Sequence, residues 1–367
     1  MSYHGETVMS SRVVPLSHLD LLETRLGSSW QSIRKAQIET QKRRTELSDQ
    51  FAQHGSPDTS LVVFGSVARQ EVTSGSDLDW ILLIDGQSVP EHKEQEREIE
   101  RRLIEGKFIA PGASGVFGRM VGSHDLVHNI GGEDDLNSNT TRRVLLLLES
   151  HPVGNREAYD RVRRQIVRRY LCDDRGLTHS ESDVRIPRFL LNDLTRYWRT
   201  VTVDFVYKQR ADADKKWALR NAKLRMSRKL IFAAGLSHVF FCHLDPAAEQ
   251  ARTELKIKQD VSLLTAYLSE QLAMPPLETV AKVCNELSIG DQVGRNIFDN
   301  YDRFLGILDD QNKRDELAKA TTHADLRDSA AWREIRDVST PFHDGLVTLF
   351  LASNKELTDL TMKYGVF

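Results

Sequence analysis

The stretch LVVFGSVAR at residues 61–69, followed by SDLDWILLI at residues 76–84, decides the fold of this chain. Its first apolar run predicts a buried strand, which Gly65-Ser66 ends before a short helix that begins near Val67. Unpaired backbone amides and the helix dipole favour negative charge at such a turn. The pattern therefore predicts a phosphate-binding turn, to which Ser66 adds a hydroxyl donor.

The second stretch predicts a buried strand that begins inside an acidic motif. Side chains alternate along a strand, so Asp77 and Asp79 are expected on one face while Leu78 and Trp80 point into the core. Two neighbouring carboxylates repel each other unless a cation lies between them. Magnesium prefers oxygen ligands and commonly binds one or two carboxylates together with substrate phosphates, so this spacing predicts a magnesium site.

A lone Asp-x-Asp is usually a solvated turn, but here it follows a Gly-Ser turn and each motif stands at a strand end. Gly65-Ser66 followed by Asp77-x-Asp79 resembles the signature of the DNA polymerase β-like nucleotidyltransferase superfamily. The resemblance implies transfer of a nucleoside monophosphate to a hydroxyl, release of pyrophosphate, and two metal ions held by acidic residues on a mixed sheet. Segments 59–84 and 115–150 also loosely resemble the amino-terminal region of bacterial protein uridylyltransferases.

Two helices further along the chain carry polar faces. Asn192, Arg196 and Arg199 lie at i, i+4 and i+7, and a second face contains Lys216, Arg220, Lys223 and Ser227. Such cations are suited to hold the β- and γ-phosphates and the departing pyrophosphate. The alternative is a solvated face with ion pairs to Asp193 or Asp204. The residues predicted to bind the nucleotide are Gly65, Ser66, Arg69, Ser76, Arg220, Lys223 and Ser227.

The resemblance also implies a third carboxylate, on a strand antiparallel to the Asp77-Asp79 strand. Asp125 is the preferred candidate, because apolar residues flank it in the segment 121–127. It would bind the metal that lowers the pKa of the attacking hydroxyl. Asp204, Asp134 and Asp135 are the alternatives.

The remaining pattern predicts an α+β fold. Residues 16–54 are expected to be helical with an interruption at 27–29, residues 91–105 to form a charged surface helix, and residues 116–130 to continue the sheet. From residue 139 onward the pattern is helical almost throughout.

We therefore expect a small mixed-sheet catalytic domain at 1–138, with helices at its amino terminus, and a helical domain at 139–367. The nucleotide would bind in the cleft that the helical domain closes.

Composition limits the class of protein. The 367 residues include 28% charged and 40% hydrophobic residues, ordinary values for a globular protein. No apolar run reaches the roughly 20 residues of a membrane span, and Met1–Ser11 lacks the features of a secretory signal. Three cysteines without Cys-x-x-Cys spacing argue against a disulfide framework or a zinc site. We expect a cytoplasmic protein with no membrane partner.

Charge is unevenly distributed. Residues 151–230 contain 20 Lys+Arg against 10 Asp+Glu, a local excess of ten positive charges, which leaves the remainder of the chain at −13. A nucleoside triphosphate or a longer nucleic acid would explain such a surface, and solvated helix faces are the alternative.

The main prediction is a magnesium-dependent nucleotidyltransferase with two metal ions, for which Mn²⁺ is an alternative. It would use an NTP or dNTP and a hydroxyl of a nucleotide or nucleic-acid end, giving an oligonucleotide or cyclic nucleotide. By analogy, its role would be bacterial signalling or anti-phage defence, with an effector protein acting on the product. The alternatives are transfer of AMP or UMP to a protein or small molecule, and a catalytically silent nucleotide-binding regulator. The presence of both Asp77 and Asp79 argues against a silent regulator, because such a protein has no need for two carboxylates that repel each other.

Overall fold

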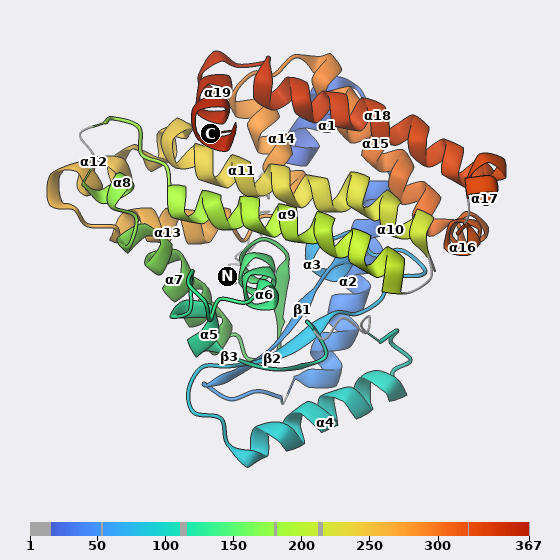
Figure 1. Cartoon of the computed structure of the whole chain (residues 1–367), viewed down its shortest axis with the longest axis horizontal. Coiled ribbons are helices and arrows are strands. Elements are labelled where there is room, and N and C mark those ends of the chain that lie inside the picture. The colour runs from blue at the N-terminus through green and yellow to red at the C-terminus, as the bar shows by residue number, and fades with distance from the viewer. Residues whose placement is uncertain are drawn as a thin grey trace, which may run out of the picture.

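The computed structural model describes residues 16–52, 54–110, 116–179, 182–211, 216–321 and 323–366. The expectation for Met1–Ser11 concerns residues outside this range. In the described part a small mixed sheet lies beneath a broad layer of helices (Figure 1). The predicted α+β class is confirmed.

The sheet has four strands in the order β3-β2-β1-β4. They are β1 (Thr59–Phe64), β2 (Trp80–Ile84), β3 (Arg119–Gly122) and β4 (Ser150–Val153). Strand β1 is antiparallel to both β2 and β4, whereas β2 and β3 are parallel. Parallel strands need a crossover connection, and α4 (Pro90–Glu105) provides it. The two motif strands are thus direct neighbours near the middle of the sheet.

The expected alternation of side chains along the motif strands is confirmed. Leu78 and Trp80 are buried together with Leu61 and Val63, in a core cluster formed with α2 (Gln31–Phe51) and α4. Ile81 and Leu83 belong to the larger cluster on the opposite face, where the helical layer packs. Asp77 and Asp79 share the parity of those residues but precede β2, which begins at Trp80 and not inside the acidic motif as expected. Both line a cavity together with residues of the helical layer.

The segment 116–130 differs from its prediction. Only residues 119–122 form a strand, and α5 (Ser123–Val127) follows it at once. Apolar alternation stops after Val121, and the next buried residues, Leu126 and Val127, are adjacent in sequence. Adjacent buried positions do not fit a strand with period two, but they fit a short helix that packs on its neighbours. In addition, β3 is parallel to β2 rather than antiparallel.

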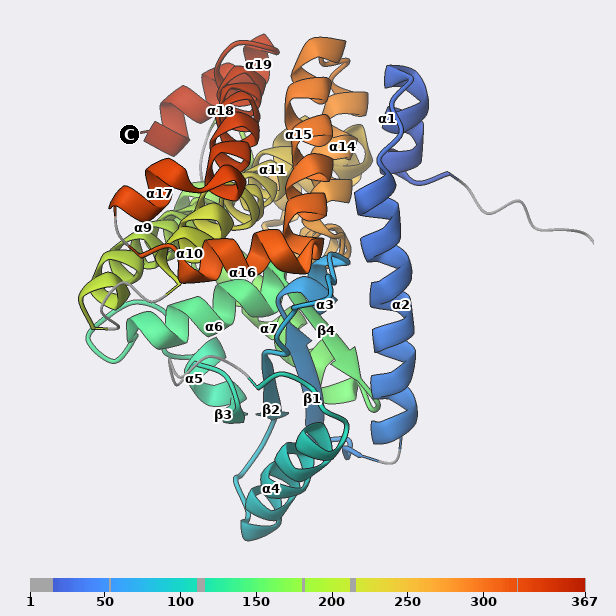
Figure 2. The ribbon, with the colours of Figure 1, turned by 90° about the vertical axis from the view of Figure 1, so that its right-hand side faces the viewer.

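The amino-terminal helices connect the sheet to the helical layer. Helix α1 (His18–Leu26) ends at Gly27, whose φ of 60° is left-handed, and the predicted interruption is confirmed. Helix α1 packs against α14 (Pro276–Glu286), and α2 packs against both α15 (Asp291–Asp309) and β4. Figure 2 shows α2 standing beside the sheet and reaching up to α15.

The remaining helices form the layer above the sheet. They are α6 (Asn137–Leu148), α7 (Glu157–Cys172), α8 (Arg175–Thr178), α9 (Arg188–Ala211), α10 (Trp217–Lys223), α11 (Lys229–Leu244), α12 (Glu249–Lys258), α13 (Ser262–Gln271), α16 (Gln311–Lys319), α17 (His323–Asp328), α18 (Ala330–Leu351) and α19 (Lys355–Leu360). Three tighter or wider turns accompany them: the π-helices η1 (Leu224–Arg228) and η3 (Thr361–Val366) and the 3₁₀-helix η2 (Pro246–Ala248).

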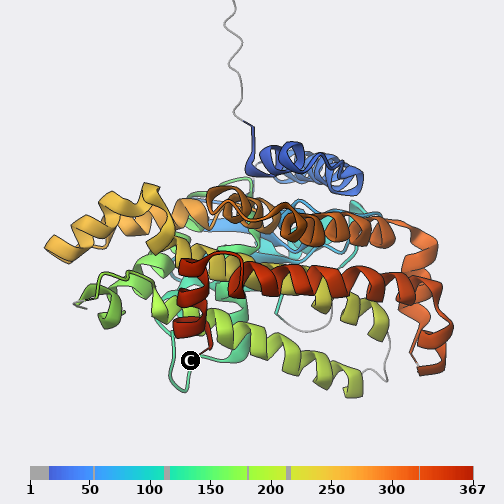
Figure 3. The ribbon, with the colours of Figure 1, turned by 90° about the horizontal axis from the view of Figure 1, so that it is seen from above.

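The helical layer is built around α11, which is buried on most of its faces. Seen from above, α1 and α2 lie along one side of the molecule and α9 along the other (Figure 3). One continuous core joins the inner face of the sheet to these helices. The division at residue 138 stays a prediction, since β4 joins the sheet from beyond it and α1 packs on α14.

A buried polar cluster fastens α6 to α9. The Arg143 side chain is completely buried, and its Nη2 lies 2.9 Å from Asp135 Oδ2 and 2.5 Å from Asp193 Oδ2. The hydroxyl of Tyr170 donates to the same Asp193 carboxylate. Buried charges require such partners, so the cluster fixes the register of the two helices.

Among the described helices, none by itself has the length and apolar character needed to cross a membrane. The bent pair Trp217–Leu244 and Pro246–Lys258 meets that test together, by length and composition only.

Candidate active site

The Gly-Ser turn joins the two sequence motifs. Gly65 has a φ of +71°, a conformation that residues with a Cβ rarely adopt, which explains the glycine at this position. Helix α3 (Ser66–Arg69) begins one residue earlier than expected. The amide of Phe64 donates to the carbonyl of Asp79 at 2.9 Å. The turn and the acidic motif are therefore held side by side by the backbone.

A cavity lies against both motifs, and we call it the motif cavity. It is lined by Gly65, Ser66, Arg69, Glu71, Thr73, Ser76, Asp77, Asp79, Lys223, Ser227, Arg228, Leu305, Leu308 and Arg314. Most of the residues predicted to bind the nucleotide or metal are in this lining. The exceptions are Arg220 and Asp125, which do not line it.

Ser66 presents a hydroxyl that has no hydrogen-bond partner among the described residues, although the oxygen atom is buried. A buried hydroxyl without a partner costs free energy. It also stands at the amino-terminal end of α3, where the first backbone N–H groups of a helix lack partners within the helix. The carbonyls at the other end of this helix are occupied, because Arg44 of α2 donates to Val67 and Ala68. The hydroxyl is therefore open to a water molecule or a ligand in the motif cavity.

The surroundings shift the pKa values of the two acidic residues of the motif in opposite directions. Burial acts to raise the pKa of Asp77, but Lys223, Arg228 and Arg314 outweigh it and the pKa is lowered. The Nζ of Lys223 lies 3.9 Å from Asp77 Oδ1. Burial, the charge of Asp77 and the charge of Glu149 together raise the pKa of Asp79 to about 6, in spite of Arg228. A cation bound between the pair would relieve this repulsion.

A network of buried ion pairs and hydrogen bonds surrounds the Gly-Ser turn. Arg69 Nε lies 2.7 Å from Glu71 Oε2, and its Nη1 lies 3.0 Å from Glu149 Oε2. Arg228 reaches Glu149 from the helical layer, at 3.2 Å. The hydroxyl of Tyr301, on α15, donates to Glu71 Oε1 at 2.9 Å. The network thus ties α3 to helices that lie more than 150 residues further along the chain.

Glu149, which the sequence reasoning missed, is the additional carboxylate beside Asp79. A Cβ placed on Gly65 would lie 3.6 Å from Asp79 Oδ2 and 3.9 Å from Glu149 Oε1, so both carboxylates border the same turn. Glu149 directly precedes β4, and Ser150 pairs with Phe64 at the end of β1. No local pattern singles it out, because its position depends on the pairing of β4 with β1.

Asp125 lies outside the motif cavity. It is exposed on α5, where it accepts a hydrogen bond from Asn129 at 3.1 Å. Because β3 is parallel to β2 and Gly122 pairs with Ile84, the residues after β3 lie at the end of the sheet opposite Asp79. The alternatives also lie elsewhere: Asp135 binds Arg143, Asp204 lines another pocket, and Asp134 is exposed and does not line the motif cavity.

Arg228 and Arg314 are the other residues that sequence reasoning missed. Residues five apart on an α-helix lie about 140° apart around the axis, so Lys223 and Arg228 would face different directions. The π-helix η1 between them uses about one more residue per turn and brings both side chains into the motif cavity. Arg314 lies on α16, 235 residues after Asp79 in the sequence. Neither feature can be read from a local pattern.

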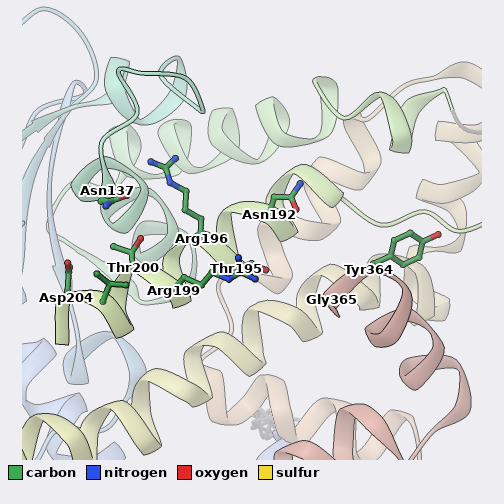
Figure 4. Close-up of a pocket in the computed structure, with 10 residues that line it drawn as sticks. Asn137, Asn192, Thr195, Arg196, Arg199, Thr200, Asp204, Tyr364 and Gly365 are labelled. Carbon is green, nitrogen blue, oxygen red and sulfur yellow. The ribbon is translucent and has the colours of Figure 1, made fainter. Parts of the chain in front are cut away.

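The polar face of α9 lines a separate pocket. Asn192, Thr195, Arg196 and Arg199 follow one side of the helix, with Tyr364 and Gly365 toward one end of the pocket (Figure 4). Arg196 Nη1 lies 2.7 Å from Asp135 Oδ2, so an internal ion pair occupies it. None of these residues lines the motif cavity.

The donor set of the motif cavity fits a hard cation. Within the described residues, no group of three or more His, Cys, Asp or Glu side chains is placed to hold a metal ion. The Asp77-Asp79 pair supplies carboxylate oxygens alone, the ligand type that Mg²⁺ prefers when substrate phosphates and water complete its shell. The repulsion that raises the pKa of Asp79 is the observation that agrees with a cation there.

Fold and site together place a Gly-Ser turn with an unpartnered hydroxyl beside two carboxylates. Residues 44–109 match the family model of the nucleotidyltransferase domain. The chain therefore carries a nucleotidyltransferase domain of the DNA polymerase β-like superfamily, a class whose members transfer a nucleoside monophosphate. No curated protein and no solved structure gave a significant match to the chain.

Proposed function

We propose that this protein is a magnesium-dependent nucleotidyltransferase whose active site is the motif cavity. The observation that carries the proposal is the unpartnered hydroxyl of Ser66, which shares this cavity with Asp77, Asp79 and four cationic side chains. Phosphate oxygens would satisfy the hydroxyl and the amides of α3. Lys223 and Arg228 would counter the negative charge of the triphosphate.

Asp77 and Asp79 would hold the magnesium ions, which when bound polarise the phosphate and the attacking hydroxyl. The residues of the chain would perform the remaining tasks. Ser66 and the α3 amides orient the triphosphate so that pyrophosphate can leave, and the cations stabilise that leaving group. Glu149 keeps Arg69 and Arg228 in place beside it. In the reaction, the acceptor oxygen forms a bond to the α-phosphorus while the bond to pyrophosphate breaks.

The acceptor is proposed to be a hydroxyl of another nucleotide or of a nucleic-acid end. The positive excess in residues 151–230 supports an anionic acceptor. An oligonucleotide or cyclic nucleotide made in this way would suit bacterial signalling or anti-phage defence, with an effector protein that responds to the product.

The experiment is to incubate the purified protein with each labelled NTP or dNTP and Mg²⁺ and to resolve the products by size and by attachment to protein. A ladder or a cyclic product supports the proposal. Label on a protein or small molecule would redirect it to mono-nucleotidyl transfer. Intact triphosphate under all conditions would overturn it.

Variants define which carboxylates take part. Asp77→Ala and Asp79→Ala should each abolish transfer, whereas Asp49→Asn removes an exposed carboxylate and is the matched control. Glu149→Gln and Asp125→Asn test two different roles, because Glu149 holds Arg69 and Arg228 in place whereas Asp125 is the third metal carboxylate expected from the sequence. We expect loss of activity for Glu149→Gln only, and loss for Asp125→Asn would restore the interpretation made from the sequence.

A further inference from the structure

The loop that leads into Asp77 is docked on the corner between α15 and α16. The amide of Ser74 donates to Asp309 Oδ1 at 3.0 Å, and its hydroxyl donates to the Asp309 carbonyl at 3.1 Å. Nη2 of Arg314 donates to the carbonyl of Gly75. The family match ends at residue 109, so this corner lies far outside it. Figure 2 shows α16 lying across the end of the sheet beside α3.

Gly75 permits this contact because it lacks a side chain. A Cβ at this position would lie 2.3 Å from Nε of Arg314 and 2.7 Å from its Cζ. Real Cβ atoms do not approach other atoms so closely, so any other residue would displace the guanidinium. The close approach therefore needs the glycine, and it places a cation directly against the loop of the acidic motif.

Arg314 also lines the motif cavity, together with Ser66, Asp77 and Lys223. It forms no ion pair with a carboxylate among the described residues. A guanidinium has five N–H donors, and the carbonyls of Gly75 and Leu308 account for two of them. Donors therefore remain for a ligand, and a planar guanidinium matches the oxygens of a phosphate.

We propose that Arg314 binds the triphosphate of the donor nucleotide and, through Gly75, couples phosphate binding to the position of Asp77. The inference rests on the proposed nucleotidyl transfer and adds a binding residue from the carboxyl-terminal helices. A phosphate that holds the guanidinium also holds the loop, so donor binding strengthens the contact that keeps the Asp77 carboxylate in position.

Inorganic triphosphate with Mg²⁺ is the probe, because it contains the recognised group without a base. Calorimetry on the full chain should show binding to the wild type. Arg314→Gln should weaken this binding about tenfold to a hundredfold, since it removes a charge-assisted hydrogen bond. Arg314→Lys keeps the positive charge but lacks the forked guanidinium, so its affinity for triphosphate should lie between those of the wild type and Arg314→Gln. Lys313→Gln is the control: it removes a charge from the same helix, where Lys313 pairs with Glu334 at 2.7 Å.

Coupling through Gly75 is tested with a double-mutant cycle on kcat. Gly75→Ala should lower kcat, and the double variant with Arg314→Gln should be no worse than Arg314→Gln alone, because both act on one contact. Additive losses would overturn the coupling. Thermal melting of each variant confirms folding, and Arg314→Lys supplies the comparison if Arg314→Gln fails to fold.

The outcomes separate this inference from the proposed function. If the wild type transfers nucleotides and Arg314→Gln binds triphosphate normally, the role of Arg314 is wrong while nucleotidyl transfer stands. If the wild type binds triphosphate in an Arg314-dependent way but transfers nothing, the proposed function fails and the binding role stands. Absence of triphosphate binding by the wild type would overturn the inference.

Discussion

Replacing Asp79 by Asn should stabilise the metal-free protein while it abolishes activity. The pKa of Asp79 is raised from 3.8 to about 6 by burial and by the charges of Asp77 and Glu149. One pKa unit corresponds to about 1.36 kcal/mol, so the ionised carboxylate costs the folded state up to about 3 kcal/mol at neutral pH. The variant carries no such charge, and its free energy of unfolding should exceed that of the wild type by as much.

The sign follows from proton linkage. Because the folded-state pKa is higher than the unfolded-state value, the folded protein binds the proton more tightly. Stability from this group is therefore greatest below about pH 4 and is lost as the pH rises through 6. The advantage of Asp79→Asn over the wild type should be near zero at pH 4 and should reach its full size above pH 7.

The assay is urea denaturation in EDTA at several pH values, with Asp134→Asn as a control expected to change stability by no more than about 0.5 kcal/mol. Mg²⁺ should then stabilise the wild type and not the variant, because it binds the ionised pair. Below pH 6 the apparent Mg²⁺ affinity of the wild type should fall about tenfold per pH unit. An Asp79→Asn variant that is no more stable than the wild type at pH 7.5 would refute the reasoning.

Three further outcomes are expected. Arg143→Met should lower the free energy of unfolding by about 3–5 kcal/mol in chemical denaturation, because it leaves Asp135 and Asp193 buried without their partner; a loss below 1 kcal/mol would contradict this role. Ser66→Ala should raise the KM for the nucleotide about tenfold in steady-state kinetics without loss of stability, since the hydroxyl has no partner among the described residues. Tyr301→Phe should destabilise the protein by roughly 1–3 kcal/mol in thermal melts, because Glu71 loses a buried donor; an unchanged melting temperature would argue against the network.

Local sequence patterns were sufficient for the motif strands and the turn between them. The alternation of Leu78 and Trp80 with the two aspartates placed each side chain on its face, and Gly27 marked the end of α1. Both depend on residues that are adjacent in sequence. The prediction that residues 116–130 continue the sheet was wrong. The segment forms four residues of edge strand followed by one helical turn, and these are too few residues to establish a hydrophobic period.

The sequence by itself determined the class of domain and the donor side of its site. Gly65 is required by a positive φ, Ser66 by the hydroxyl at the turn, and Asp77 and Asp79 by strand alternation, and all of these constraints act within about 20 residues. Only the tertiary structure decided which groups complete the site. Arg228 and Arg314 reach the motif cavity through a π-helical turn and the packing of α16. Strand pairing places Glu149 beside the Gly-Ser turn, where it binds Arg69 and Arg228. Their positions depend on contacts between distant segments, and such contacts leave no periodic signal in the chain.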